Sequence, residues 1–264
     1  MSAFAGIVRF DGAGGDSEIE EALLRAIAAR QKARPRIRRA PGAAFVMGGE
    51  DFATRTAADD GALFAALARL DNRDELGAAL AIPTPELLSI ADTTLLLRMF
   101  GRWGAAGLAR CLGAFVFAQW DPQARRLILG RDYLGFNRTL FYYRGRGFAA
   151  FATAQRILLA LPCVPRELDE VMLADFLAVN FTERRRTFYR GIEHVPTRMF
   201  VTIDREQIRH QEYWSPDFRT AQPYRRVDDY IERARELFDQ AVATATAGYR
   251  KIAISATGGL DSST

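Results

Sequence analysis

The sequence predicts an α+β domain, then a linker, then the start of an α/β domain. Residues 114–121 and 126–131 are strand-like runs that flank Pro-Gln-Ala, which is typical of a β-hairpin. Residues 92–103 carry apolar side chains at helical spacing. Near the C-terminus, a long amphipathic pattern and a short apolar run lead into a Gly-Gly turn. That last combination indicates a second domain.

The N-terminal third alternates between strand and helix signals. The run Ala5–Phe10 predicts a strand that Asp-Gly terminates, and Ser17–Arg30 predicts a helix. Ser17 can cap that helix because Glu20 follows three residues later. We expect Arg34–Pro41 to be irregular and residues 43–47 to form a strand. Residues 61–70 are ambiguous between strand and helix.

The rest of the chain predicts two more hairpins and two more helices. The hairpins pair residues 140–143 with 148–152 and residues 199–204 with 208–213. The helices span Asp169–Val179, with Asp169 as its cap, and Asp229–Thr246, with a buried apolar stripe, before a strand from Lys251. Prolines and polar residues without a period mark a linker. The predicted boundaries are 1–212 for the first domain, 213–226 for the linker and 227–264 for the second domain.

Composition argues against several function classes. The net charge is +4, carried largely by arginine, but the runs 34–39 and 184–186 contain no interleaved aromatic residues. We therefore expect solvated loops and no nucleic-acid binding. No apolar stretch approaches about 18 residues, and no basic segment precedes an apolar N-terminal run, so neither a membrane span nor export is predicted.

The few cysteines and histidines limit the chemistry further. Cys111 and Cys163 lie in apolar contexts, which predicts buried, reduced thiols and a cytoplasmic location. Two histidines without a Cys/His cluster argue against a zinc site. The neighbours Arg131 and Asp132 are a charged pair that we expect to brace the central strands.

The C-terminal residues carry the clearest chemical signal. A β-branched run at 251–255 leads into Thr257-Gly-Gly-Leu-Asp-Ser-Ser263. A strand, a loop and a helix start would direct backbone N–H groups, hydroxyls and a helix N-terminus to one place, which suits a polyphosphate. The chain stops at Thr264, so we expect the nucleotide site in these 264 residues to be incomplete.

Several segments together resemble the asparagine synthetase superfamily. They occur in the family's order and span nearly the whole chain, although each is weak alone. The matching segments are residues 2–12, 72–76, 91–93, 112–121, 130–135, 140–143, 188–192, 194–196, 213–214 and 257–263. This resemblance implies a four-layer αββα, N-terminal nucleophile hydrolase-like glutaminase domain. The ATP-pyrophosphatase synthetase domain would begin after it and be truncated at the phosphate loop.

The implied glutaminase site is degenerate. Ser2 stands where the family has the cysteine nucleophile, whose free α-amine acts as the base. Leu67-Ala68-Arg69 replaces Asn-Gly-Glu, which removes an oxyanion-stabilising amide worth roughly 3 kcal/mol in comparable sites. No Arg-Leu-Ser motif matches between residues 41 and 67. Only Asp92 remains from the glutamine-binding set, and it is also a candidate helix N-cap. We therefore expect an inactive scaffold.

The resemblance also implies an ATP site with Mg²⁺. Asp261 is the metal candidate in this loop. The phosphate-lining candidates are Thr257, Gly258, Gly259, Ser262 and Ser263, together with Asp261.

The expected activity is amide formation by carboxylate adenylation, followed by attack of an amine, on a small-molecule or peptide carboxylate. Three alternatives stay open: an asparagine synthetase-like ligase, a lasso-peptide cyclase or β-lactam synthetase-like ligase that uses an internal amine, and a non-catalytic remnant or binding module. We expect the 264-residue chain alone to have little ligase activity. The sequence also leaves a homodimer open.

Overall fold

The chain divides into two compact units. A computed structural model describes residues 2–12, 16–31, 34–49, 55–56, 61–135, 138–180, 182–220 and 224–259. The units are Met1–Ser215 and Pro216–Thr264, and the division between them falls within the stretch predicted as a linker.

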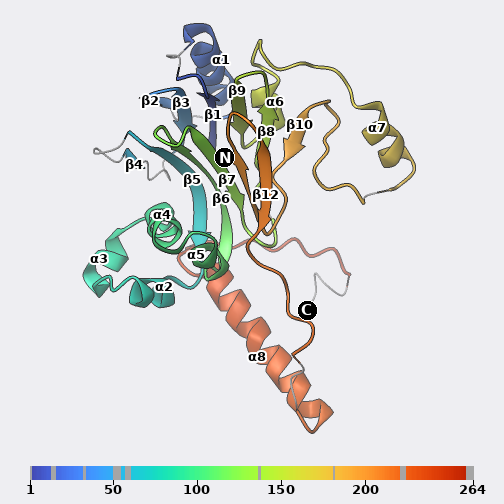
Figure 1. The fold of residues 1–264 in the computed structure, drawn as a ribbon. Helices are drawn as coiled ribbons and strands as arrows, with labels where there is room; N and C mark the ends of the chain where they lie inside the picture. Colours follow the sequence, from blue (N-terminus) through green and yellow to red (C-terminus); the bar gives the residue numbers. More distant parts are fainter. Residues whose placement is uncertain are drawn as a thin grey trace. The chain divides into compact units, whose positions relative to one another are not determined.

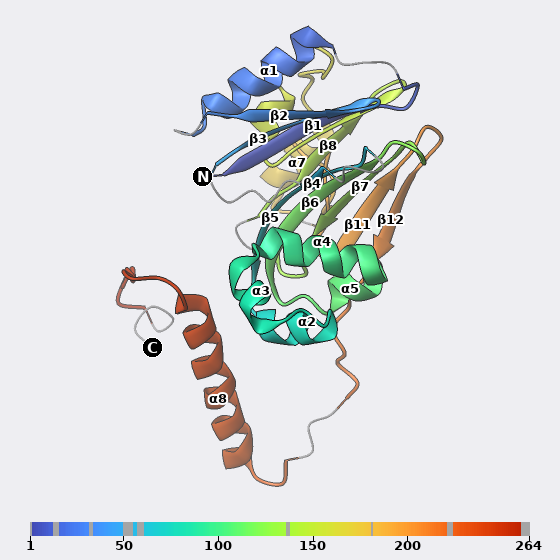
Figure 2. The ribbon, with the colours of Figure 1, turned by 90° about the vertical axis from the view of Figure 1, so that its left-hand side faces the viewer.

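The first unit has two stacked antiparallel sheets with helices on their outer faces (Figures 1 and 2). Figure 2 shows α1 over the outer face of one sheet and the helices α2–α5 against the outer face of the other. The layers therefore follow the order helix, sheet, sheet, helix. This arrangement confirms the fold class predicted for the first domain.

Each sheet is ordered by strand pairs distant in sequence as well as by hairpins. The first sheet has the order β10 (Ile192–His194), β8 (Phe141–Arg144), β9 (Phe148–Ala152), β1 (Ala3–Arg9), β3 (Ala43–Gly48), β2 (Arg36–Ala40). The second has the order β12 (Ile208–Glu212), β11 (Met199–Ile203), β7 (Arg126–Arg131), β6 (Gly113–Asp121), β5 (Leu63–Leu70), β4 (Arg55–Thr56). All three predicted hairpins, β6–β7, β8–β9 and β11–β12, are confirmed.

Helices occupy both outer layers and the later connections. They are α1 (Ser17–Ala28), α2 (Arg73–Ala79), α3 (Thr84–Ser89), α4 (Asp92–Trp103), α5 (Ala105–Ala109), α6 (Gln155–Leu158), α7 (Glu170–Leu177) and, in the second unit, α8 (Val227–Thr246). The predictions for α4 and α7 are confirmed, and Asp169 caps α7 by accepting a hydrogen bond from the Met172 N–H at 3.0 Å.

Both faces of the first sheet are buried, which explains the apolar runs of its strands. On β1, Phe4 and Val8 face the core between the sheets, while Ala5 and Ile7 face the helical layer. Successive side chains of a strand point to opposite faces, so a strand covered on both sides loses the usual apolar–polar alternation. A third cluster lies between the second sheet and helices α2–α5.

Two local predictions at the N-terminus were wrong. Asp16, rather than Ser17, caps α1, because its Oδ1 accepts the N–H groups of Glu18 at 3.1 Å and Ile19 at 3.4 Å. The stretch expected to be irregular contains β2, which pairs with β3 along its length. A tertiary ion pair also anchors β2: Arg39 Nε donates to the buried Glu20 of α1 at 3.0 Å.

The ambiguous residues 61–70 form a strand because of their partner. Leu63–Leu70 pairs with β6 over its whole length. The same residues could satisfy a helical pattern in isolation, and long-range pairing decides between the two.

The second unit contains α8 followed by an irregular segment. Residues 251–257 form no strand, so that prediction was wrong for the described residues. A strand needs a hydrogen-bonded neighbour, and this unit contains no other strand among its described residues. The apolar stripe of α8 was expected to be buried, but Ile231, Phe238 and Val242 are exposed.

Two further sequence expectations concern thiols and membranes. Both cysteines are free; Cys111 is buried as predicted, whereas Cys163 is half-buried. Burial raises the pKa of the Cys111 thiol to about 12. Within the described residues, no helix has both the length and the apolar character needed to cross a membrane.

Replacing Gly107 should destabilise the first unit. A Cβ at this position would collide with the backbone carbonyl of Met99, where α5 packs closely against α4. We expect Gly107→Ala to lower the free energy of unfolding by about 2 kcal/mol, a typical cost of overpacking. Gly101→Ala is the matched control, because nothing lies within 4 Å of its Cβ position; it should be neutral or slightly stabilising. Urea unfolding measures both, and equal effects would contradict the close approach.

Acid should destabilise the protein through His194. Burial, with a contribution from the nearby Arg131 cation, lowers the pKa of His194 to about 4. The unfolded histidine has a higher pKa, so between these values the unfolded chain binds more protons and stability falls as pH falls. We expect a loss of up to about 3 kcal/mol from pH 7 to pH 4 that His194→Gln reduces. Denaturant unfolding at several pH values tests this, and an unchanged acid dependence in the variant would refute it.

Candidate functional site

The predicted nucleophile position lies at the start of the first sheet's central strand. Ser2 immediately precedes β1 and is half-buried. Gly49, just after β3, lies against it: φ is +112°, and a Cβ there would collide with the Ser2 side chain. Only a glycine fits both that backbone conformation and that close approach. Among the described residues, no hydrogen bond or ion pair joins Ser2 to a histidine, lysine or carboxylate.

A buried amide that the sequence did not single out lies beside this position. The Gln31 side chain packs against Gly48, the residue before Gly49. Its Nε2 and Oε1 atoms are both buried without a hydrogen-bond partner among the described residues. Buried polar atoms normally have partners, so Gln31 is the polar group that could meet a ligand here. No motif marks Gln31 in the sequence. Gln31 comes after α1, and where its side chain lies depends on how β3 packs.

The sheets place Ser2 and the end of β5 at the same end of the domain. At the opposite end, Trp120 Nε1 donates to the Pro41 carbonyl at 2.9 Å and its ring contacts Phe10, which follows β1. Trp120 also pairs with Leu63, the first residue of β5. The strands β1 and β5 therefore run in opposite directions across the core. The last residues of β5 thus lie at the Ser2 end.

At that end the expected oxyanion-stabilising amide is replaced by core packing. Leu67 is buried in the cluster between the sheets, together with Phe4 and Met47. Two residues later, Arg69 lies on the same strand face and makes an ion pair with Asp71 at 3.3 Å. The segment therefore presents an apolar side chain and a paired cation where the resembled family has an amide and a carboxylate.

The carboxylate of Asp92 is already bound by the protein. It accepts the backbone N–H of Leu70 at 2.9 Å and forms an ion pair with Arg73. The prediction that Asp92 caps its helix was wrong: Ala91 is the N-cap of α4, and Asp92 is the first helical residue. Its carboxylate instead ties α4 to the end of β5. A role in binding glutamine stays a prediction.

Neighbouring charged groups also shift the pKa values of residues in this region. Partial burial, together with the nearby Asp92 carboxylate, raises the pKa of the Asp71 carboxyl, and the Arg69 guanidinium opposes this shift. Burial also raises the pKa of Tyr133, with contributions from the carboxylates of Asp132 and Asp71. The Tyr133 ring packs on Trp214 at a centroid distance of 4.9 Å. The charged and polar groups at this end therefore influence one another electrostatically.

Asp132 and Arg131 brace the strands, as the sequence predicts. Buried Asp132 accepts backbone N–H groups from Phe115 at 3.3 Å, Leu134 at 3.0 Å and Gly135 at 2.6 Å. Burial raises its pKa, and these donors and Arg131 oppose that shift. Arg131 donates to the Gly135 carbonyl at 2.8 Å. Both side chains are thereby committed to holding the loop after β7.

The predicted nucleotide loop belongs to the second unit. Thr257, Gly258 and Gly259 are exposed, and Gly258 has φ +79° with open space around its Cβ position. That left-handed conformation suits a glycine-rich turn that directs backbone N–H groups to phosphate. The remaining predicted residues, Asp261, Ser262 and Ser263, lie outside the described residues. Within the described part, no three His, Cys, Asp or Glu side chains group in a way that could hold a metal ion.

Comparison with known structures supports the fold. Glutamine phosphoribosylpyrophosphate amidotransferase from B. subtilis matches with a TM-score of 0.55 at 13% identity, over 81% of this chain and 50% of that one. An allosteric regulatory enzyme of purine biosynthesis matches with a TM-score of 0.50 at 13% identity, over 81% and 49% of the two chains. At such identities the likeness concerns the fold alone.

Two relatives resemble part of this chain in sequence. Asparagine synthetase [glutamine-hydrolyzing] 3 of Bacillus subtilis (strain 168) is 24% identical over 195 residues, which cover 74% of this chain and 31% of the relative. Amidase chyE of Penicillium rubens is 23% identical over 181 residues, covering 67% of this chain and 26% of the relative. The matched part thus spans about a third or less of these relatives.

The family model of the glutamine amidotransferase domain matches residues 62–214, more than half of the chain. This match includes both β5, which carries the altered residues 67–69, and the bracing Asp132. The chain therefore belongs to the glutamine amidotransferase domain family and contains the N-terminal domain of the asparagine synthetase superfamily.

Proposed function

We propose that this chain is the N-terminal part of an ATP-dependent, amide-forming ligase whose amidotransferase domain does not hydrolyse glutamine. In this proposal the first unit is a structural scaffold. The nucleotide chemistry belongs to the domain that begins with the second unit.

The observation that carries the proposal is the loss of free polar groups around Ser2. Amide hydrolysis needs a nucleophile, a base and donors aimed at the developing oxyanion. Leu67 is instead part of the core, and Arg69 is paired with Asp71. Asp92 is occupied by Leu70 and Arg73. The Gln31 amide, which has no hydrogen-bond partner among the described residues, is one polar group and does not replace the full set.

The glycine-rich turn supports the nucleotide half of the proposal. Gly258 has a left-handed backbone conformation with φ +79°, which suits a glycine-rich turn that binds phosphate. Thr257, Gly258, Gly259, Ser262 and Ser263 would contact the phosphates, and Asp261 would hold Mg²⁺. ATP supplies the adenylyl group that converts a carboxylate into a good acylating agent, and Mg²⁺ neutralises charge on the departing pyrophosphate. An amine then attacks the activated carboxyl carbon and loses a proton; the amide C–N bond forms as the acyl–oxygen bond breaks and AMP leaves.

The amine source separates two versions of the ligase. An asparagine synthetase-like enzyme with an inactive glutaminase would need free ammonia. A lasso-peptide cyclase or β-lactam synthetase-like enzyme would use an amine within its own substrate, and the altered residues 67–69 favour this alternative because it needs no glutamine hydrolysis. The amidase relatives support an amide-related role in general.

Glutamine hydrolysis should be absent. We expect the purified chain to release glutamate from glutamine no faster than Ser2→Ala. Ser2→Cys should also stay inactive, because a better nucleophile does not replace the missing oxyanion donor, worth roughly 10²–10³-fold in rate. An enzyme-coupled glutamate assay measures all three proteins. Activity in the wild type that Ser2→Ala abolishes, or activity gained in Ser2→Cys, would overturn the scaffold proposal.

Nucleotide binding by the 264-residue chain should be weak. In the second unit the described residues form one helix and an irregular segment, which cannot enclose a nucleotide between sheet and helix. Calorimetry with Mg-ATP should therefore detect no binding tighter than about 1 mM, equivalent to about −4 kcal/mol. Gly258→Val should behave like the wild type. Tighter binding that this variant loses would show that the turn alone forms a working site.

A further inference from the structure

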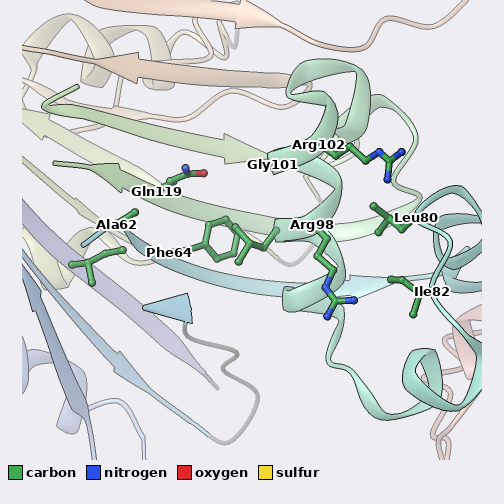
Figure 3. A pocket seen from close by; sticks show the side chains of 10 residues that line it. Ala62, Phe64, Leu80, Ile82, Arg98, Gly101, Arg102 and Gln119 are labelled. Carbon is green, nitrogen blue, oxygen red and sulfur yellow. The ribbon is translucent and has the colours of Figure 1, made fainter. Parts of the chain in front are cut away.

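A pocket far from the Ser2 end opens on the helix-covered face of the second sheet. It has a volume of about 470 Å³, within the range of about 300–1,000 Å³ typical of small-molecule sites. Figure 3 shows residues of α4 on one side, Phe64 and Gln119 on the strands, and Leu80 and Ile82 on the connection after α2. Ser2 immediately precedes β1 of the other sheet, so the pocket is separate from the candidate glutaminase site.

The strand residues of the pocket form an apolar surface with one polar interruption. Phe64 and Gln119 are directly opposite each other on β5 and β6. Gln119 shares the helix-facing side of β6 with Phe117. Its Oε1 atom is buried and has no hydrogen-bond partner among the described residues. A buried acceptor without a donor is unfavourable, and a ligand N–H or O–H group would satisfy it.

The helix supplies positive charge at the same pocket. Arg98 and Arg102 lie one turn apart on α4, and both line the pocket. Arg98 pairs with Glu86 at 2.7 Å. Arg102 has no anionic partner among the described residues; its guanidinium lies 4.9 Å from the centre of the Trp103 ring. Two arginine cations and the Glu86 carboxylate give this region a net charge of +1. A ligand with a single negative charge would balance it.

We propose that this pocket binds a small monocarboxylate that has an apolar body and an N–H or O–H donor. The carboxylate would contact Arg102 and Arg98, since guanidinium groups bind carboxylates through paired hydrogen bonds. The apolar body would cover Phe64, Leu97 and Ile82, and the donor would reach Gln119 Oε1. A neutral apolar molecule would leave the arginine charge unmatched. This site does not depend on the proposed ligase activity.

Binding of N-acetyl-L-phenylalanine to the full 264-residue chain tests the site. This probe carries a carboxylate, an aromatic body and an N–H donor. Calorimetry should give saturable binding at concentrations up to about 10 mM. The probe's C-terminal amide, which lacks the charge, should bind at least tenfold more weakly. No saturable binding of the acid, or equal binding of acid and amide, would overturn the proposal.

Variants locate the site and separate its two polar contacts. Arg102→Gln should weaken binding of the acid about tenfold, whereas Arg146→Gln, which removes the same charge from an exposed hairpin turn, should leave it unchanged. Gln119→Leu should weaken N-acetyl-L-phenylalanine but not 3-phenylpropionate, which has no donor. Circular dichroism checks that each variant is folded. Equal losses in the two arginine variants, or an unchanged affinity for N-acetyl-L-phenylalanine in Gln119→Leu, would refute the assigned contacts.

Discussion

The packing of the two sheets against each other is the constraint on which the rest of the first unit depends. The facing side chains form the largest core cluster, with Phe4, Phe45 and Phe151 from one sheet and Leu67 and Trp120 from the other. Because each sheet must also cover its outer face, helices are required on both sides. The same packing determines which strand ends meet. It brings the start of β1 and the end of β5 together, where an amidotransferase domain needs its site.

The physical basis of the degenerate site is a change in what the end of β5 contributes. Leu67 contributes apolar area to the core, and Arg69 and Asp92 are held in ion pairs. These contacts support the fold, and they leave Leu67, Arg69 and Asp92 engaged with the protein itself. Stability and catalysis make opposite demands on such positions, since catalytic groups must remain unpaired until substrate arrives. At these positions the domain has side chains that stabilise the fold through packing or ion pairs.

The outer faces of the two sheets differ in how closely helices cover them. On the first sheet, α1 covers the strands closely, and the Arg39–Glu20 ion pair joins helix to edge strand. On the second sheet, α4 leaves space above Phe64 and Gln119. Beside that space, within the described part of the chain, Gln119 Oε1 has no hydrogen-bond partner and Arg102 has no anionic partner. The proposed loss of glutamine hydrolysis and the proposed binding site in this layer rest on different residues.

The sequence by itself determined the elements whose signals are local. The spacing of apolar residues in α4 and the turns of the hairpins were sufficient, because each depends on residues within a few positions. The substitutions at residues 67–69 were also visible without a structure. Tertiary structure decided the features that depend on contacts between residues far apart in the sequence. It made residues 63–70 a strand by pairing them with β6, and made residues 36–40 an edge strand beside β3. It also directed Asp92 to Leu70 and Arg73, and left the Gln31 amide atoms and Gln119 Oε1 buried without hydrogen-bond partners among the described residues. Hydrogen bonding between segments far apart in the chain leaves no periodic trace in the sequence, so no local pattern could have predicted these outcomes.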